Sequence, residues 1–243
     1  MLWVGQFGIA DGEAREHSPW VGAFPAPAPG EAAADLYLVV EPALPGSEEF
    51  CAELVAAIGS VFLQKRLSLS GGLLRALRAA HENLREWNRK SLREHRVAAG
   101  VSCLALRPGS GQALRPGSDR APEQDTETDG AGHEAYLAQV APAAAALYRE
   151  GVIHILEPDL PDAAEPLGMN EEFWPDFSRW ELAAGDRLLL LSPSLARGLP
   201  PQELAAALSL APQDALPTLY RQARSVPNCG ALLVAALAEG PAA

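Results

Sequence analysis

The segment Gly185-Asp186-Arg187-Leu188-Leu189-Leu190-Leu191-Ser192-Pro193-Ser194-Leu195 is where the architecture of this chain can be read first. Its Gly-Asp pair indicates a turn, and the leucines that follow predict a strand over 187–191. A continuous apolar run predicts a buried strand over 35–41, and a further strand is predicted over 231–237. These strands anchor the interpretation of the rest of the chain.

The remaining elements divide between short strands and helices. Ser47 is placed as the N-cap of a helix that ends near Gln64, with acids in its first turn, where the helix dipole favours them. Further strands are predicted over 1–9, 97–106, 135–141, 144–149, 152–156 and 177–182, and further helices over 71–94, 201–209 and 212–224. Long helices early and short ones late, among many strands, predict an α+β layered sandwich.

The helix predicted over 71–94 has one apolar face. Its apolar side chains recur at helical spacing, which places them on the side that faces the core. These side chains are Leu73, Leu74, Leu77, Ala80, Leu84 and Trp87. Phe177 and Trp180, from the strand over 177–182, are also expected to pack in the core.

The composition argues against several classes of function. The chain has 243 residues, 48% hydrophobic content and a formal net charge of −12, which is typical of a globular protein. Because nucleic acids and anionic membranes attract basic surfaces, neither is expected as a partner. Cys51, Cys103 and Cys229 are scattered, and neither a signal peptide nor a long apolar segment occurs. We therefore expect a cytoplasmic protein with reduced thiols and no membrane association.

One polar segment interrupts the pattern. Residues 107–133 are rich in Pro, Gly, Ser, Thr and acids, and Leu-Arg-Pro-Gly-Ser occurs at both 106–110 and 114–118. Such a segment cannot bury enough apolar surface to offset the entropy lost on ordering it. We predict a disordered loop between two strands, inside a single domain that spans 1–240.

Short motifs occur in a fixed order on both sides of the leucine strand. They are Gly12-x-x-Arg15, Val39-Val40-Glu41-Pro42, Gly100-Val-Ser102 and Pro227-Asn228. Over nearly the whole chain, this frame resembles the metal-dependent Ser/Thr protein phosphatases of the PPM family (type 2C). The resemblance implies a four-layer α-β-β-α sandwich, with two central, mostly antiparallel sheets flanked by helices.

The resemblance also implies a reaction whose ligands are largely replaced in this chain. In PPM phosphatases, carboxylates hold two divalent metals, and a bridging hydroxide attacks the phosphate. The positions that would hold metal carry Glu41, Pro42, Pro142, Pro193 and Pro227. We therefore predict neither a bound metal nor a catalytic residue. Arg15 matches an arginine that contacts the substrate phosphate in the family, although a surface arginine paired with an acid is the plainer interpretation.

The main hypothesis is a catalytically inactive pseudophosphatase that acts as a protein-binding or regulatory module. Its partner would be a Ser/Thr kinase or a phosphoprotein, and Trp174 is the candidate interface residue because aromatic side chains are enriched in binding hot spots. A binder of a small anion through Arg15 is a further alternative.

The enzymatic alternative is a residual or atypical Ser/Thr phosphatase that depends on Mg²⁺ or Mn²⁺. Its metal ligands would be Glu41, Asp11 or acids of the segment 157–176. Those acids are Glu157, Asp159, Asp162, Glu165, Glu171, Glu172 and Asp176.

Overall fold

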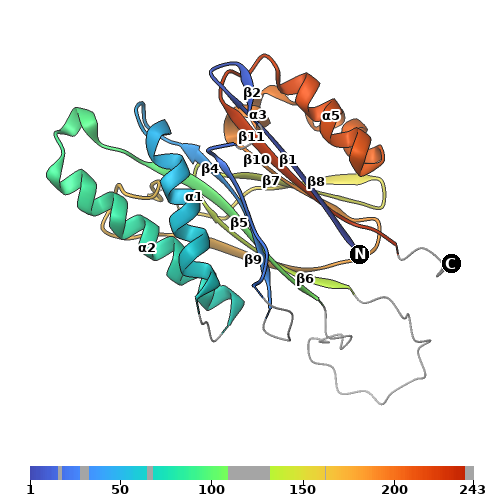
Figure 1. The fold of residues 1–243 in the computed structure, drawn as a ribbon, viewed down its shortest axis with the longest axis horizontal. Coiled ribbons are helices and arrows are strands. Elements are labelled where there is room, and N and C mark those ends of the chain that lie inside the picture. Colours follow the sequence, from blue (N-terminus) through green and yellow to red (C-terminus); the bar gives the residue numbers. More distant parts are fainter. Residues whose placement is uncertain (16–17, 28–32, 65–67, 109–131, 162, 239–243) are drawn as a thin grey trace.

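The computed structural model describes all residues of the chain except 16–17, 28–32, 65–67, 109–131, 162 and 239–243 (Figure 1). The strands form two antiparallel sheets. The six-stranded sheet has the order β2 (Glu13–Arg15), β1 (Leu2–Ala10), β11 (Cys229–Ala236), β10 (Arg187–Leu191), β7 (Ala144–Arg149), β8 (Val152–Leu156). The five-stranded sheet has the order β3 (Val21–Phe24), β4 (Asp35–Pro42), β5 (Ala99–Pro108), β6 (His133–Val140), β9 (Asp176–Leu182).

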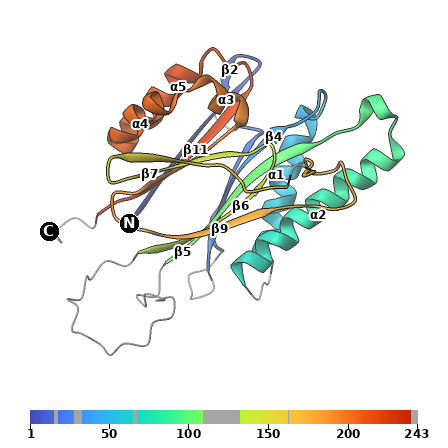
Figure 2. The ribbon, with the colours of Figure 1, turned by 180° about the vertical axis from the view of Figure 1, so that it is seen from behind.

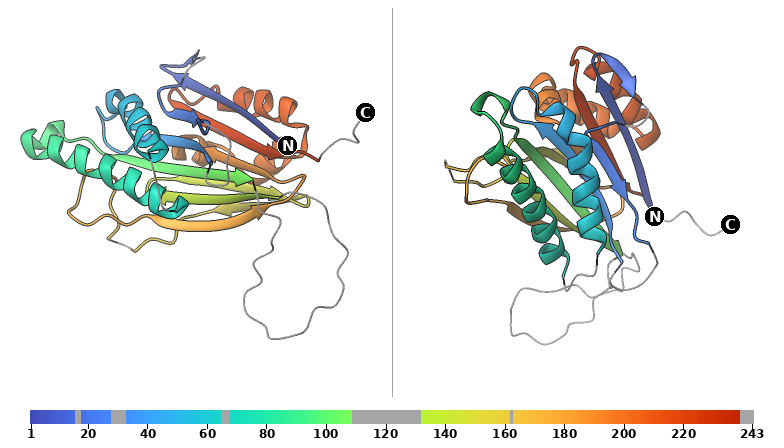
Figure 3. Two further views of the ribbon diagram at one scale, coloured as in Figure 1. Left: turned by 60° about the horizontal axis from the view of Figure 1, so that its bottom comes forward. Right: turned by 60° about the vertical axis from the view of Figure 1, so that its left-hand side comes forward.

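Helices cover the outer face of each sheet. Helices α1 (Glu48–Leu63) and α2 (Leu69–Lys90) lie on the five-stranded sheet, and a 3-10 turn, η1 (Arg93–His95), follows them. Helices α3 (Pro193–Gly198), α4 (Pro201–Ser209) and α5 (Pro212–Ala223) lie on the six-stranded sheet. Figures 2 and 3 show the two helical layers on opposite sides of the paired sheets. The predicted α-β-β-α sandwich is therefore confirmed.

The fold has three layers of core, and the leucine strand β10 contributes to two of them. In β10, Leu188 and Leu190 join the core between the two sheets, whereas Leu189 and Leu191 join the core beneath α3–α5. Because successive side chains of a strand point to opposite faces, a strand with both faces covered needs apolar residues at every position. A third core lies between the five-stranded sheet and α1–α2.

Several elements differ from the sequence-based prediction. The short strands β2 and β3 and the helix α3 were not predicted. Strand β5 continues to Pro108 and β6 begins at His133, so both ends of the segment predicted as a loop over 107–133 are strand. The predicted disorder falls on 109–131, which lie outside the described residues. Among the helices that the structure describes, none is long and apolar enough to cross a membrane.

The prediction for Trp87 was wrong. Its side chain is 49% exposed, because the next residue, Asn88, takes the inward position on α2. Asn88 Nδ2 donates to the carbonyl oxygens of Val97 (2.8 Å) and Gly168 (2.9 Å), and its Oδ1 accepts from Val97 N (2.8 Å). A buried amide with its polar atoms paired is stable in a core. Spacing alone could not distinguish this polar contact from the neighbouring tryptophan.

Phe177 also departs from expectation. Its side chain is 38% exposed because β9 alternates between an inner and an outer face, and Phe177 lies on the outer one. Trp180, which was also expected in the core, is partly buried and packs against the core between the sheets.

Candidate functional site

Segments that are far apart in the sequence meet at one edge of the sandwich. Strand β4 ends there with Glu41 and Pro42, and α3 begins there after Ser192. Pro227 and Asn228 directly precede β11, which pairs with β10. The replaced positions Pro42, Pro193 and Pro227 thus come together around Glu41: Ser194 N donates a hydrogen bond to Glu41, and Ser194 Oγ lies 3.2 Å from the carbonyl oxygen of Asn228.

Glu41 is the acid at the centre of this edge, and only 9% of it is exposed. Its Oε1 accepts a hydrogen bond from Ser194 N (3.1 Å) and its Oε2 accepts one from Ser194 Oγ (3.3 Å). Burial raises the pKa of the Glu41 carboxyl, and the bonds from Ser194 and the charge of Arg197 only partly oppose this. Both carboxyl oxygens therefore already have partners within the chain.

A serine network surrounds the carboxyl group. Ser194 Oγ lies 3.1 Å from Ser192 Oγ and 3.2 Å from the carbonyl oxygen of Asn228. Ser192 Oγ accepts a hydrogen bond from Gly230 N (3.2 Å). Pro193 lies between the two serines as the first residue of α3, where its missing N–H costs nothing. The sequence pattern Ser-Pro before an apolar residue was the available signal for this short helix.

The turn between β1 and β2 is attached to the same edge. Asp11 N donates to Asn228 Oδ1 (2.8 Å), and Gly12 N donates to the carbonyl oxygen of Pro227 (2.9 Å). Gly12 has φ +77°, a backbone conformation that glycine adopts readily. Asn228 thus serves as a structural connector between the first and the last motif.

The segment that contains Ser18 and Trp20 passes from one sheet to the other at this edge. Gly8 and Gly230 lie opposite each other in β1 and β11, and a Cβ on Gly8 would lie 2.3 Å from Ser18 Cβ. Trp20 then accepts a hydrogen bond from Val40 N through its carbonyl oxygen (2.8 Å). Because Gly8 and Gly230 have no side chains, there is room for the segment with Ser18 and Trp20 to pass from one sheet to the other.

Pro142 lies beside the strand that pairs with β4. Gly100 of β5 is directly opposite Glu41, and a Cβ on Gly100 would lie 1.8 Å from the Pro142 carbonyl oxygen. Pro142, one of the replaced positions, therefore lies in the same neighbourhood as Glu41, and it contributes backbone atoms rather than a carboxylate.

The charge of Glu41 contributes to the raised pKa of two buried thiols, Cys51 and Cys229. Burial, followed by the charges of Glu41 and Glu48, raises the pKa of Cys51 to about 12. Burial and the charge of Glu41 raise the pKa of Cys229 to about 11. Since the thiolate is the form that binds metal or attacks a substrate, neither thiol is prepared for these roles at neutral pH. All the cysteines, including Cys103, are free and buried, as predicted.

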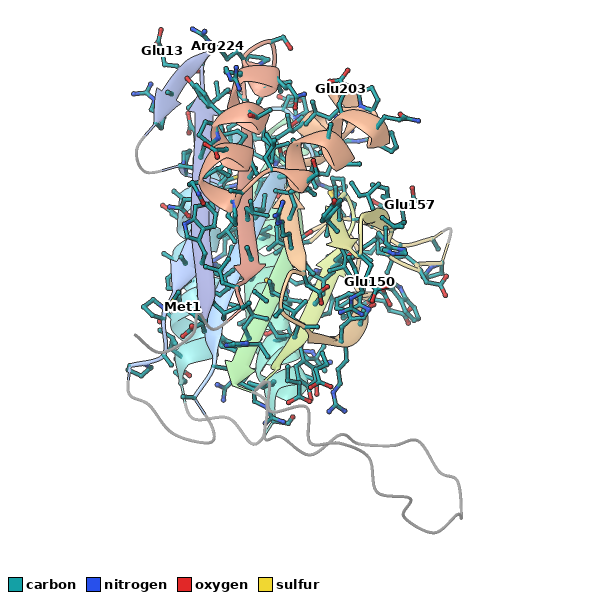
Figure 4. All side chains as sticks on the ribbon, turned by 90° about the vertical axis from the view of Figure 1, so that its right-hand side faces the viewer. Met1, Glu13, Glu150, Glu157, Glu203 and Arg224 are labelled. Atoms are coloured by element: carbon teal, nitrogen blue, oxygen red, sulfur yellow. The ribbon has the colours of Figure 1, made fainter. Side chains whose placement is uncertain are left out.

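Neither Arg15 nor Trp174 takes part in the hydrogen bonds around Glu41, although Arg15 pairs with Gly8 in β1, next to the Ser18 segment. Arg15 is exposed on β2 and forms no ion pair within the described part of the chain, so the structure does not supply the acid partner expected for it. Figure 4, in which Glu13 marks the start of β2, shows this strand at the periphery. Trp174 is 44% exposed and borders a hollow beside α2 that also contains Arg78, Arg85 and Glu171.

Comparisons with known proteins bear on the fold. No protein-family model and no curated protein matches the sequence. The serine/threonine phosphatase of S. agalactiae matches in structure with a TM-score of 0.71 and 15% identity, over 97% of this chain and 99% of that one. Stp1 of Staphylococcus aureus matches at 0.71 and 13%, over 98% and 96%. PstP/Ppp of Mycobacterium tuberculosis matches at 0.62 and 16%, over 98% and 99%.

This chain has the PPM phosphatase fold. Enzymes with the PPM fold normally depend on Mg²⁺ or Mn²⁺, which are hard cations that need several oxygen ligands. The residues at the Glu41 edge do not fit such ions. Glu41 is buried and already bonded to Ser194, and the prolines around it offer no side-chain donor. Within the described ranges, no three residues among His, Cys, Asp and Glu gather in a way that could hold a metal ion.

The first prediction concerns the charge of Glu41. Because burial raises its pKa in the folded state above the ordinary 4.5, the folded chain holds this proton more tightly than the unfolded chain does. The contribution of Glu41 to stability is therefore complete below pH 4.5 and is lost as pH rises through the raised pKa. We expect Glu41→Gln, which mimics the protonated form, to be more stable than the unmodified protein at pH 8. Its stability should also fall less between pH 4.5 and pH 8.

Urea unfolding at a series of pH values measures both effects. Glu157→Gln, which removes an exposed acid elsewhere, is the control and should follow the unmodified protein. Glu41→Ala should lose about 1–3 kcal/mol, because the donors of Ser194 are left unpaired. A Glu41→Gln variant that is less stable than the unmodified protein at pH 8 would contradict this account.

Proposed function

We propose that this chain is a catalytically inactive PPM-fold protein, a pseudophosphatase, that acts in the cytoplasm as a protein-binding or regulatory module. One observation carries the proposal: Glu41, the acid at the converging edge, is buried and both its oxygens accept hydrogen bonds from Ser194. A phosphoryl-transfer site of the PPM kind needs carboxylates that are open to cations. Pro193 and Pro227 stand where further carboxylates would be required.

The proposed partner is a protein, either a Ser/Thr kinase or a phosphoprotein. The half-exposed indole of Trp174, in the segment between β8 and β9, supports a binding role, since tryptophan is enriched in interface hot spots. Arg15 is a second candidate contact, because its guanidinium is exposed, has no acid partner among the residues that the structure describes, and suits a phosphate group. Neither side chain bonds to Glu41, so the proposed contacts do not require metal at that residue.

Hydrolysis of a generic aryl phosphate tests the proposal. We expect no turnover that depends on millimolar Mn²⁺ and disappears with EDTA. The matched variants are Glu41→Gln and Glu94→Gln, each of which removes one acid, and the exposed Glu94 is not a candidate ligand. Turnover that copurifies with the protein, requires Mn²⁺ and is lost in Glu41→Gln but not in Glu94→Gln would overturn the proposal.

That outcome would establish the second candidate, a residual metal-dependent Ser/Thr phosphatase. The observation in its favour is that an acid, Glu41, remains at the converging edge, with the Asp11 turn bonded to Asn228 beside it. Asp11 is exposed, and its carboxyl group could be recruited if the turn moved. Loss of turnover in Asp11→Asn as well as in Glu41→Gln would identify both acids as ligands.

A further inference from the structure

A groove of about 340 Å³ lies between α1 and α2. Helix α1 contributes one wall and α2 the other, and neither wall includes a residue of the Glu41 edge. The residues that line it are Glu49, Phe50, Glu53, Asn83, Leu84 and Trp87.

The centre of the groove is apolar. The rings of Phe50 and Trp87 meet edge to face, with centroids 4.9 Å apart and an interplanar angle of 62°. Leu84 is 3% exposed beneath them, whereas Trp87 leaves 49% of its surface to solvent. Asn88 makes the inward contact of this turn of α2, so Trp87 is not required to close the core. A large aromatic side chain held in a groove in this way is typical of a binding surface.

The rim of the groove is acidic. Glu49 and Glu53 are one helical turn apart on α1 and flank Phe50. Neither forms an ion pair within the described part of the chain. Glu86, beside Trp87, is already paired with Lys90 (2.8 Å) and Arg89 (3.3 Å). The unpaired charge at this groove is therefore negative, and none of the described residues that line it is basic.

The hollow beside Trp174 differs in this respect. Arg78 and Arg85 face Glu171 and Glu172 there, and Arg85 and Glu171 already lie 3.7 Å apart. Mixed charges of this kind do not select one class of partner. The α1–α2 groove has a single sign of charge around an aromatic centre, so it carries the stronger inference.

We propose that the α1–α2 groove binds a segment of a partner protein that combines an apolar anchor with arginine or lysine. The apolar side chain would pack on Phe50 and Trp87. The basic side chain would pair with Glu49 or Glu53, and an arginine over the exposed indole face gains a cation–π contact. An acidic segment would be repelled by the same glutamates and by the net charge of −12. This inference rests on the proposed binding function, since it names the chemistry of the partner.

Fluorescence anisotropy with labelled synthetic peptides tests the proposal. The probes are an amphipathic peptide of leucine and arginine, the same peptide with glutamate for arginine, and the same peptide with serine for leucine. We expect the Leu/Arg peptide to bind at least tenfold more tightly than either of the others. Trp87→Ala should weaken its binding about tenfold, and the double variant Glu49→Gln/Glu53→Gln should weaken it about fivefold and reduce its salt dependence.

Matched variants separate the groove from general charge attraction. Glu157→Gln/Asp159→Asn removes two exposed acids elsewhere, and Leu210→Ala removes an exposed apolar side chain at the end of α4. Both should bind the Leu/Arg peptide as the unmodified protein does. Equal weakening by the two double variants, or unchanged binding by Trp87→Ala, would overturn the proposal. Urea unfolding of each variant confirms that the fold is intact.

Two other outcomes are informative. If the protein self-associates in analytical ultracentrifugation and Trp87→Ala makes it monomeric, the occupant is a second copy and the proposal is wrong. If the peptides bind as expected but Mn²⁺-dependent hydrolysis is found, the groove stands and the assignment as a pseudophosphatase fails. The two proposals can therefore fail separately.

Discussion

Gly100→Ala is expected to prevent stable folding, with a loss of about 4 kcal/mol or more, which is comparable to the whole stability of many domains. The added Cβ would lie 1.8 Å from the carbonyl oxygen of Pro142 and 2.5 Å from its nitrogen. Both are backbone atoms, so no side-chain rotation relieves the clash. Gly100 also pairs with Glu41 across β4 and β5, so a shift of the strand would disturb the candidate site.

Chemical denaturation and far-UV circular dichroism measure this loss. Gly198→Ala is the control, because a Cβ there would meet nothing closer than Val226 Cγ2 at 3.9 Å. We expect Gly198→Ala to unfold at the same denaturant concentration as the unmodified protein, or slightly higher. A Gly100→Ala protein that is soluble and loses less than about 1 kcal/mol of stability would contradict the close contact between Gly100 and the backbone of Pro142.

The second large effect is expected for Arg149→Ala, with a loss of about 3 kcal/mol. Arg149 Nε donates to both carboxyl oxygens of Asp186 (3.0 and 3.1 Å), and its Nη2 donates to the Glu181 carbonyl oxygen (2.7 Å). Asp186 is almost fully buried, and its Oδ2 also accepts from Ala183 N (2.8 Å). Removing the guanidinium leaves a buried carboxylate without its counter-charge, although solvent near Arg149 limits the loss.

A double-mutant cycle separates the pair from its parts. Asp186→Asn keeps an acceptor for Ala183 N but removes the charge, so Arg149→Ala should cost less in that background, with a coupling energy of about 1–2 kcal/mol. The control is Arg224→Ala, which removes an exposed arginine at the end of α5 (Figure 4) and should change stability by less than about 0.5 kcal/mol. Additive effects of the two changes would contradict the predicted coupling.

The strands of this fold could be predicted from the sequence because their apolar runs are long and continuous. The run over 187–191 predicted β10, whereas its position between two cores, with all its leucines buried, came from the structure. The Gly185-Asp186 turn was placed correctly, yet the bond from Asp186 to Arg149 joins residues 37 positions apart. Pairing at that distance leaves no periodic trace in a single sequence.

The candidate site was harder to predict. Glu41 and the prolines were found as replaced positions, but the role of Ser194 as the partner of Glu41 was missed. That bond links residues 153 positions apart, and it depends on a short helix whose first residue is proline. Helical spacing also assigned Trp87 to the core, because spacing does not reveal that Asn88 is held by three hydrogen bonds to backbone atoms. The α1–α2 groove forms because Asn88 turns inward and leaves Trp87 exposed, so helical spacing alone could not predict the groove.

Strands β5 and β6 have a practical consequence. From Gly100, beside Glu41, to Pro108, at the other end of β5, the strand covers about 26 Å at the usual rise per residue. The connection from Pro108 to His133 therefore leaves the sheet at the pole of the molecule opposite the Glu41 edge. A label attached at His133 therefore stays a strand's length away from the Glu41 edge and does not block access to it.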